Sequence, residues 1–379
     1  MKRQKFYASA LVASFALVAG SSSGLTDHRT FRARGGNRLL SHRRQNPYVG
    51  HHHHFLEHPH QSRYSPPPQP QLESRDSPKY VLVEERKGNS FFDGFDFFTS
   101  PDPTHGMVNY LDQNAARNAG LVYVQPDGTV VMKVDNSTNL PYGALRNSVR
   151  ISSIRKYQGG LFIFDVQAGP FGCGVWPAFW TVGPDWPLGG EIDIFEGVHY
   201  GPTNQMTLHT APGCSTDTNS TVPNDFRVPP SSAGMGTSNC GPSPNNGGCY
   251  FIDNNPTSYG TKFRDAGGAV MAMEWSNRGI RIWNFPRNHV PFDLKAQKPV
   301  PALWSSAYLK AAWTSTACPP SKYFRQHSIV IDTTLCGDWA GTTYTSAGCP
   351  GTCTQQIMTA GNFDNAVWKI NAVAVYTQK

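Results

Sequence analysis

The sequence predicts an all-β fold, either a sandwich or a barrel, and two observations lead to this class. From about Tyr80 onward, short runs rich in Val, Ile, Phe and Tyr alternate with turn-forming residues. Few segments of this region repeat apolar residues with the 3.6-residue period of a helix. Many short strands over roughly 300 residues are typical of one large sandwich or barrel, so a single domain is sufficient.

The predicted strands follow one another along this region. The runs 121–124 and 129–134 flank the turn sequence Gln125-Pro-Asp-Gly128 and form a hairpin. A stretch rich in Gly, Pro, Ser and Asn from Pro212 to Gly248 predicts a cross-linked surface loop. The further predicted strands are Val149–Ile154, Leu161–Val166, Val270–Glu274, Ile280–Phe285, Ser328–Asp332 and Val367–Tyr376.

One further predicted strand, Gly190-Glu-Ile-Asp-Ile-Phe-Glu-Gly197, carries three carboxylates. Side chains of a strand alternate between its faces, so Glu191 and Asp193 share one face and the two isoleucines share the other. Regular alternation would turn Glu196 away, but a one-residue β-bulge at Ile194–Phe195 returns it to the acid face. Burying acids does not stabilise a strand, so the pattern predicts acid/base chemistry.

The chain divides into three parts. Lys2, Arg3 and Lys5 precede an apolar run, and small residues follow, which predicts a secretory signal peptide over residues 1–20. Residues 21–79 are rich in His, Pro and Arg and poor in core-forming residues, so we expect a disordered pro-segment or linker. A metal-binding tract, or a basic arm that holds acidic wall polymers, is the alternative for this part. Residues 80–379 form the predicted domain.

Charge and cysteine content limit the classes of partner and compartment. The net charge is +7, but residues 1–79 hold twelve Lys and Arg against four Asp and Glu, so the predicted domain is nearly neutral. No basic surface therefore predicts a nucleic-acid partner, and no second apolar stretch predicts a membrane contact in the mature form. Eight cysteines in an exported chain predict four disulfides, whose pairing stays open. The sequons at Asn136 and Asn219 fit a secreted glycoprotein.

The acidic strand resembles the signature of glycoside hydrolase family 16, in its bulged E-x-D-x-x-E form. Other segments resemble the fungal secreted endo-1,3(4)-β-glucanases of the laminarinase type, and together the likeness covers roughly residues 80–377. The resemblance implies a β-jelly-roll sandwich of two antiparallel sheets, with an open substrate cleft on the concave face. The segments that carry it are Asp102–Gly106, Arg146–Arg150, Val175–Trp180, Asn204–His209, Phe285–Arg287 and Leu335–Asp338.

The resemblance also implies roles for particular residues. Glu191 would be the nucleophile of a retaining glycosidase and Glu196 the general acid and then the general base, with Asp193 hydrogen-bonded to the nucleophile. Flat aromatic rings stack on sugar rings, although core packing is the alternative for each aromatic residue. The expected substrate-binding residues are Trp180, Trp186, His209, Arg150, Asn204, Gln205 and Trp283, and Trp176 and Trp339 are further candidates.

These features predict a secreted, monomeric enzyme, with possible association with the cell wall, that cleaves β-1,3-glucan and also mixed 1,3/1,4 chains. A wall β-glucan transglycosylase is one alternative, but such proteins usually carry an unbulged motif. A β-glucan-binding protein without catalysis is the second, but such relatives have lost the catalytic glutamates. We expect no cofactor and no catalytic metal. Some relatives hold a structural Ca²⁺, but no carboxylate cluster of this sequence predicts a site for one.

Overall fold

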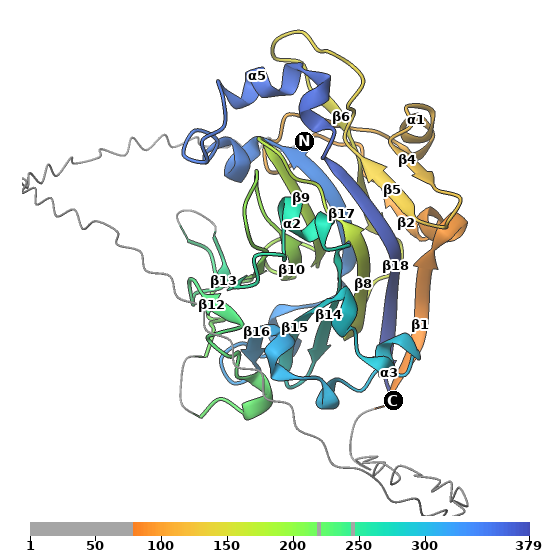
Figure 1. The fold of residues 1–379 in the computed structure, drawn as a ribbon. Coiled ribbons are helices and arrows are strands. Elements are labelled where there is room, and N and C mark those ends of the chain that lie inside the picture. Colours follow the sequence, from red (N-terminus) through yellow and green to blue (C-terminus); the bar gives the residue numbers. More distant parts are fainter. Residues whose placement is uncertain (1–78, 218–220, 244–246) are drawn as a thin grey trace, which may run out of the picture. The chain divides into compact units, whose positions relative to one another are not determined.

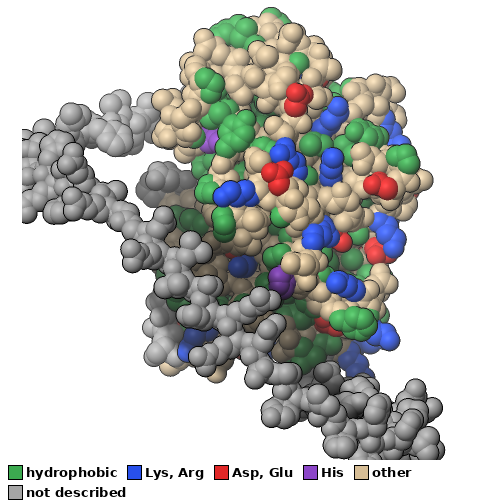
Figure 2. Space-filling view, viewed as in Figure 1, with side chains coloured by type: hydrophobic (Ala, Val, Ile, Leu, Met, Phe, Trp, Pro, Cys, Tyr) green, Lys and Arg blue, Asp and Glu red, His purple; other side chains and the backbone are tan. Residues whose placement is uncertain are grey.

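A computed structural model describes residues 79–217, 221–243 and 247–379 (Figure 1). The predicted signal peptide and nearly all of segment 21–79 lie outside the described residues. Within the described part, no helix is long and apolar enough to cross a membrane. On the face drawn in Figure 2, basic and acidic side chains are interspersed and do not gather into a single charged area.

Two eight-stranded antiparallel sheets make up the fold. In the first sheet the order is β16-β15-β14-β8-β18-β5-β4, and β1 also pairs with β18. Its strands are β1 (Tyr80–Lys87), β4 (Val122–Val124), β5 (Val130–Lys133), β8 (Gly160–Ala168), β14 (Ala269–Ser276), β15 (Gly279–Pro286), β16 (Leu309–Thr314) and β18 (Val367–Gln378).

The second sheet has the order β12-β13-β11-β10-β9-β17-β7-β2 and contains the acidic strand near its middle. Its strands are β2 (Phe95–Phe97), β7 (Arg150–Ser153), β9 (Val175–Val182), β10 (Glu191–Glu196), β11 (Gln205–His209), β12 (Ala233–Met235), β13 (Cys249–Asp253) and β17 (Ser328–Leu335).

The remaining elements are short. Strands β3 (Val108–Tyr110) and β6 (Arg146–Ser148) form a separate parallel pair. The α-helices are α1 (Gln113–Asn118), α2 (Gly260–Asp265), α3 (Phe292–Lys295), α4 (Pro320–Tyr323) and α5 (Cys353–Met358). The 3₁₀ turns are η1 (Gly88–Gly94), η2 (Asn224–Phe226), η3 (Arg287–His289), η4 (Pro301–Leu303), η5 (Ser306–Tyr308) and η7 (Ala360–Phe363), and η6 (Gly337–Gly341) is a π-helical turn.

The predicted all-β class and each predicted strand are confirmed. The hairpin around Gln125–Gly128 joins β4 to β5, and the segment predicted at 367–376 is the long strand β18. The main core lies between the two sheets, because each sheet contributes alternate apolar side chains to one cluster. In the second sheet, Ile192 and Ile194 of β10 enter this core together with Leu208 of β11, which leaves the acids on the opposite face.

All eight cysteines form disulfides, as predicted. The pairs are Cys173–Cys349, Cys214–Cys318, Cys240–Cys249 and Cys336–Cys353. Disulfides persist in oxidising compartments, so four of them agree with the predicted export of the chain. The first and last of these disulfides tie the segment around η6, which contains Trp339, to the beginning of β9 and the end of β17.

Candidate active site

The predicted β-bulge lies in β10. On the β9 side, Asp193 pairs with Trp180 and Phe195 pairs with Phe179, so β10 has one more residue than its neighbour over this interval. The residue left without a partner is Ile194, and both Ile194 and Phe195 point into the core. Two consecutive inward side chains restore the outward direction of the next residue. Glu196 therefore lies on the same face as Glu191 and Asp193.

The side chain of Asn204 holds the bulged backbone. Its Oδ1 accepts a hydrogen bond from the backbone N–H of Glu196 at 2.8 Å, and its Nδ2 donates to the carbonyl oxygen of Ile194 at 2.9 Å. Asn204 is 1% exposed, so the prediction that it binds substrate is wrong. The residue precedes β11, where strand alternation turns it to the core side, opposite to Gln205. From the core side, Asn204 fixes the backbone that directs the Glu196 side chain to the acid face.

Strand β11 places one polar side chain opposite each acid. His209 pairs with Glu191, Thr207 with Asp193, and Gln205 with Glu196. Paired residues of neighbouring strands share a face, so these three polar groups lie beside the acids. The Gln205 amide Nε2 donates to the Thr207 hydroxyl at 3.2 Å, which directs it along this row. The predicted residues His209 and Gln205 are thus brought to the acids.

Burial controls the ionisation of the acids. Burial, and then the charge of Glu196, raises the pKa of Glu191 above its ordinary value, while Arg150 opposes the rise. Burial also raises the pKa of Glu196 above its ordinary value, although a hydrogen bond from Trp176 stabilises its charged form. The pKa of Asp193 lies well above its ordinary value because of burial and the charge of Glu191. Desolvated acids this close cannot all ionise together, so the site holds a carboxylate and a protonated acid side by side.

His209 is a neutral neighbour of the acids. Burial lowers the pKa of His209 to about 4, so its imidazole carries no charge near neutral pH. Its Nε2 lies 3.7 Å from the Glu191 Oε1 and 3.5 Å from the Asp193 Oδ2. The Asp193 Oδ2 is buried and makes no hydrogen bond within the described part of the chain. The imidazole therefore offers polarity beside the nucleophile candidate without forming an ion pair with it.

Tryptophans surround the acids at different depths. Trp186 is 45% exposed, and its ring centroid lies 6.3 Å from that of His209, so a large apolar surface faces solvent beside Glu191. Trp176 donates its indole N–H to the Glu196 Oε1 at 2.9 Å, and it packs edge-on against Trp339 at 5.8 Å. An exposed aromatic face beside polar groups is the arrangement that a neutral sugar ring requires.

Arg150 and a fourth acid complete this face. Asp332 of β17 pairs with Arg150 of β7, and Asp332 accepts hydrogen bonds from the Trp180 indole at 2.8 Å and from the Tyr110 hydroxyl at 3.2 Å. Burial raises the pKa of Asp332 to about 6, against the influence of Arg150. The sequence prediction missed Asp332. The sequence held one signal for it: Asp332 ends the predicted strand Ser328–Asp332 directly after the apolar run Ile329–Ile331, so an acid belongs to a buried strand there, as in β10.

The prediction for Trp283 is also wrong. It is 2% exposed and packs edge-on against Trp304 at 5.1 Å, within a cluster that includes Phe285 and Leu309. Trp283 belongs to β15 of the first sheet, where Ile282 points into the core between the sheets. Alternation turns Trp283 to the outer face of that sheet, away from the acids.

Among the described residues, one group has the composition of a metal site: Glu191, Asp193 and His209, with ligand atoms within 4.8 Å of one another. Two carboxylate oxygens and an imidazole nitrogen suit a divalent transition metal chemically. However, the same atoms belong to the acid row already described.

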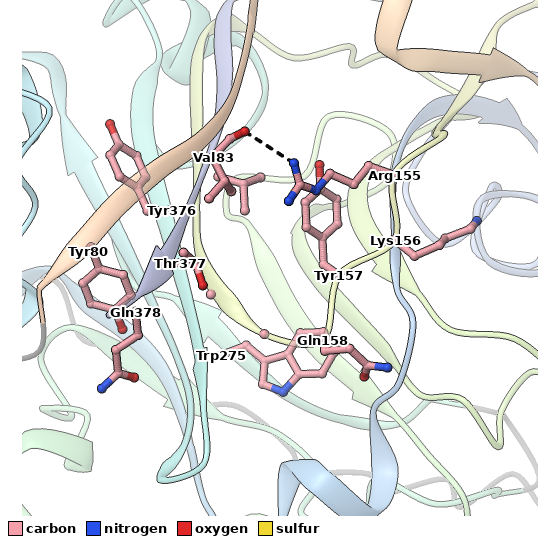
Figure 3. Close-up of a pocket in the computed structure, with 13 residues that line it drawn as sticks. Tyr80, Val83, Arg155, Lys156, Tyr157, Gln158, Trp275, Tyr376, Thr377 and Gln378 are labelled. Atoms are coloured by element: carbon pink, nitrogen blue, oxygen red, sulfur yellow. Dashed lines mark hydrogen bonds between the residues drawn. The ribbon is translucent and has the colours of Figure 1, made fainter.

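A separate cavity of about 350 Å³ lies at the ends of β1, β8 and β18 (Figure 3). Tyr80, Tyr157 and Trp275 line it, and the Arg155 Nη1 donates to the carbonyl oxygen of Val83 at its rim, at 3.4 Å. None of the predicted site residues lines this cavity. The acid face of the second sheet is therefore the place where the candidates gather.

Comparison with known proteins agrees with this geometry. The family model for XgeA-like catalytic GH16 domains matches residues 95–376, which is most of the chain. The chain belongs to glycoside hydrolase family 16. A probable glycosidase of Schizosaccharomyces pombe is similar, with 43% identity over 302 residues that cover 78% of this chain and 69% of the relative. A probable endo-1,3(4)-β-glucanase of Aspergillus fumigatus is 37% identical over 316 residues, 80% of this chain. The chain spans 46% of that relative's length.

Two solved structures of family 16 are also similar. The laminarinase 16A of Phanerochaete chrysosporium, solved with β-glucans in its donor and acceptor sites, has a TM-score of 0.73 and 37% identity. The match covers 79% of this chain and all of that chain. An elongating β-1,3-glucosyltransferase of family 16 has a TM-score of 0.70 and 35% identity, with the same coverage. The β-sandwich predicted from the family resemblance is thus confirmed.

Proposed function

We propose that this protein is an endo-acting, retaining glycoside hydrolase that cleaves β-1,3-glucan and accepts mixed 1,3/1,4-β-glucan. The observation that carries the proposal is the bulge in β10, which brings Glu191, Asp193 and Glu196 to one face of the sheet. The family's β-1,3-glucan-active relatives support the choice of substrate. The nearly neutral charge of residues 80–379 supports an uncharged polymer as well.

The proposed reaction has two displacements. In the first, the ionised Glu191 attacks the anomeric carbon, the glycosidic C–O bond breaks, and the leaving oxygen takes the proton of Glu196. In the second, a water molecule gives a proton to Glu196 and attacks the same carbon, and the bond to Glu191 breaks. Asp193 lies between them and holds a proton that it shares with the ionised nucleophile. Two inversions at one carbon retain the β-configuration.

The proposed sugar contacts surround these acids. Trp186 and Trp180 offer aromatic faces to the C–H faces of glucose rings, and Arg150, His209 and Gln205 offer polar atoms to the hydroxyls. The Trp176 indole holds the side chain of Glu196 in its working direction. This set differs from the sequence prediction by the loss of Asn204 and Trp283.

We also propose that the protein acts outside the cell as a monomer and needs no metal for turnover. The four disulfides support export. Proton transfer between Glu196 and the leaving oxygen supplies the acid catalysis that a metal would otherwise provide.

The test is incubation of the purified full chain with laminarin, lichenan, carboxymethyl-cellulose and agarose, with measurement of new reducing ends. We expect reducing ends from laminarin, fewer from lichenan, and none from the other two. Endo-action predicts a mixture of oligosaccharides at early times. Retention predicts that the first product seen by NMR is the β-anomer. No reducing ends from any β-1,3-containing glucan would refute the proposal.

Variants test the assigned roles. Glu191→Gln should abolish turnover and leave binding of laminarioligosaccharides largely intact, because the amide keeps the shape of the side chain but cannot attack. Glu85→Gln, the same exchange on β1, is the matched control and should leave the rate unchanged. Substantial turnover by Glu191→Gln would mean that another residue is the nucleophile.

A transglycosylase is the second candidate, because one similar structure is that of a β-1,3-glucosyltransferase. The two activities share the first displacement and differ in whether water or a sugar hydroxyl attacks the intermediate. Laminarihexaose at rising concentration separates them. Products longer than the substrate as the major species would favour transfer, and shorter products alone favour hydrolysis.

A further inference from the structure

Asp332 lies in a row of side chains that crosses the acid face. Strand register aligns Glu196 of β10 with Ala178 of β9, Ala178 with Asp332 of β17, and Asp332 with Arg150 of β7. Asp332 is 6% exposed, so its carboxylate is desolvated. Burying a carboxylate costs free energy unless its surroundings pair with it or hydrogen-bond to it. A buried acid at this place in the row is therefore expected to have a function there.

Asp332 is held by two hydrogen bonds. Its two carboxylate oxygens accept one hydrogen bond each, from the Trp180 indole at 2.8 Å and from the Tyr110 hydroxyl at 3.2 Å. The indole of Trp180 can donate only along one direction in its ring plane, so this bond fixes the orientation of the plane. Asp332 thus orients an aromatic ring of the proposed sugar-binding set.

Arg150 belongs to the same assembly. Its guanidinium carbon lies 5.0 Å from the centroid of the Trp180 ring and 4.7 Å from that of Phe98, so the cation is layered between the two rings. The Nε atom of Arg150 is buried and has no hydrogen-bond partner among the described residues. The charge of Asp332, on the neighbouring strand, attracts the guanidinium. One carboxylate is therefore hydrogen-bonded to Trp180 and aligned with Arg150 across the strand pair.

We propose that Asp332 is a positioning residue that pre-forms a sugar platform, by fixing the plane of Trp180 and keeping the Arg150 guanidinium layered against it. The platform is made of Phe98, Arg150 and Trp180, and its ligand is a neutral glucose unit of the chain bound beside the reacting one. Asp332 acts through these residues and does not itself transfer a proton. The inference deepens the proposed function and rests on it for the identity of the sugar.

The proposal predicts that loss of Asp332 weakens binding more than it slows the chemical step. Asp332→Asn keeps a carbonyl oxygen for the indole but removes the charge opposite Arg150, and it should raise KM for laminarioligosaccharides roughly tenfold. Asp332→Ala removes both and should raise KM further. In each case kcat should change by no more than about threefold. Tyr110→Phe is the matched control, because it removes the other hydrogen bond to Asp332 and leaves the platform, so its KM should stay within about twofold.

A double-mutant cycle keeps the test valid if Asp332→Ala folds poorly. Arg150→Lys keeps the charge but loses the planar layer, and its effect on KM should be strongly non-additive with that of Asp332→Asn. Additive effects would overturn the proposal. An unchanged KM in Asp332→Asn, with only a lower melting temperature, would also overturn it, because a merely structural role moves stability alone.

Binding measured without turnover separates this inference from the proposed function. Calorimetry with laminarihexaose uses Glu191→Gln as the parent and adds Asp332→Asn to it. A roughly tenfold weaker affinity in the double variant supports the platform even if the rate of the wild-type chain on laminarin is low. Equal affinities overturn the inference and leave the proposed hydrolysis standing.

Discussion

Replacing Asn204 by alanine should reveal how much the bulge depends on one side chain. The amide of Asn204 satisfies the backbone N–H of Glu196 and the backbone carbonyl of Ile194. Both groups lie at a buried site, and the methyl group of alanine cannot hydrogen-bond to either of them. Leaving a buried backbone group without a partner costs about 1–3 kcal/mol. Two such groups predict a loss of about 2–6 kcal/mol from the free energy of unfolding.

This loss should appear in two independent measurements. A domain of this size loses roughly 2 °C of melting temperature for each kcal/mol, so Asn204→Ala should melt about 4–12 °C lower than the wild-type chain. At a temperature where the variant is still folded, kcat should fall about 100-fold, because a shift of roughly 1 Å in Glu196 misaligns the general acid. The assays are thermal unfolding followed by circular dichroism, and release of reducing ends from laminarin.

A surface variant controls for the exchange itself. Asn109→Ala removes an exposed hydrogen bond to Asn147 and should change the stability by no more than about 0.5 kcal/mol. The reasoning is refuted if Asn204→Ala melts within 1 °C or so of the wild-type chain and keeps its rate. In that case the packing of Phe195 alone would hold the bulge.

Three further predictions concern pH, the tryptophans and metal ions. The rate should fall as pH rises through the raised pKa of Glu196, where this acid loses the proton that it donates. Trp176→Phe should move this limb to higher pH because the hydrogen bond that stabilises the ionised Glu196 is gone; a limb that moves to lower pH would contradict the assignment. Trp186→Ala should raise KM with little change in melting temperature, whereas Trp283→Ala should cost about 3–5 kcal/mol of stability and leave KM unchanged; the reverse pattern would overturn the placement of both rings. Prolonged dialysis against EDTA should leave the rate on laminarin unchanged, and a loss that a divalent cation restores would show that a metal is needed.

The placement of the acids could be predicted from the sequence to a large extent. Period-two alternation puts Glu191 and Asp193 on one face, and the extra residue before Glu196 requires a bulge, so the order of residues within one strand is sufficient. His209 and Gln205 are brought beside the acids by the register of β11. The sequence alone does not contain that register, and the family resemblance supplied it.

The two wrong substrate contacts have a common physical cause. Alternation gives the relative faces of residues within a strand but does not say which face meets the other sheet. Asn204 lies on the buried side next to β11, and Trp283 lies on the outer face of β15 under Trp304. The sequence was equally compatible with Asn204 beside the acids or beneath them, and with Trp283 exposed or buried. Only the packing of the sheets distinguishes a structural group from a surface that meets substrate.

The sequence by itself determined the all-β class, the strands, the even number of half-cystines and the three acids that share a face. The tertiary structure decided what surrounds those acids. It placed Asp332 of β17 two strands from β10, gave Trp180 its hydrogen-bond partner and put Asn204 beneath the bulge. These contacts join segments up to about 150 residues apart in the chain. Local periodicity carries no information about which distant strands become neighbours. That pairing is decided when the apolar faces of both sheets are buried in one core.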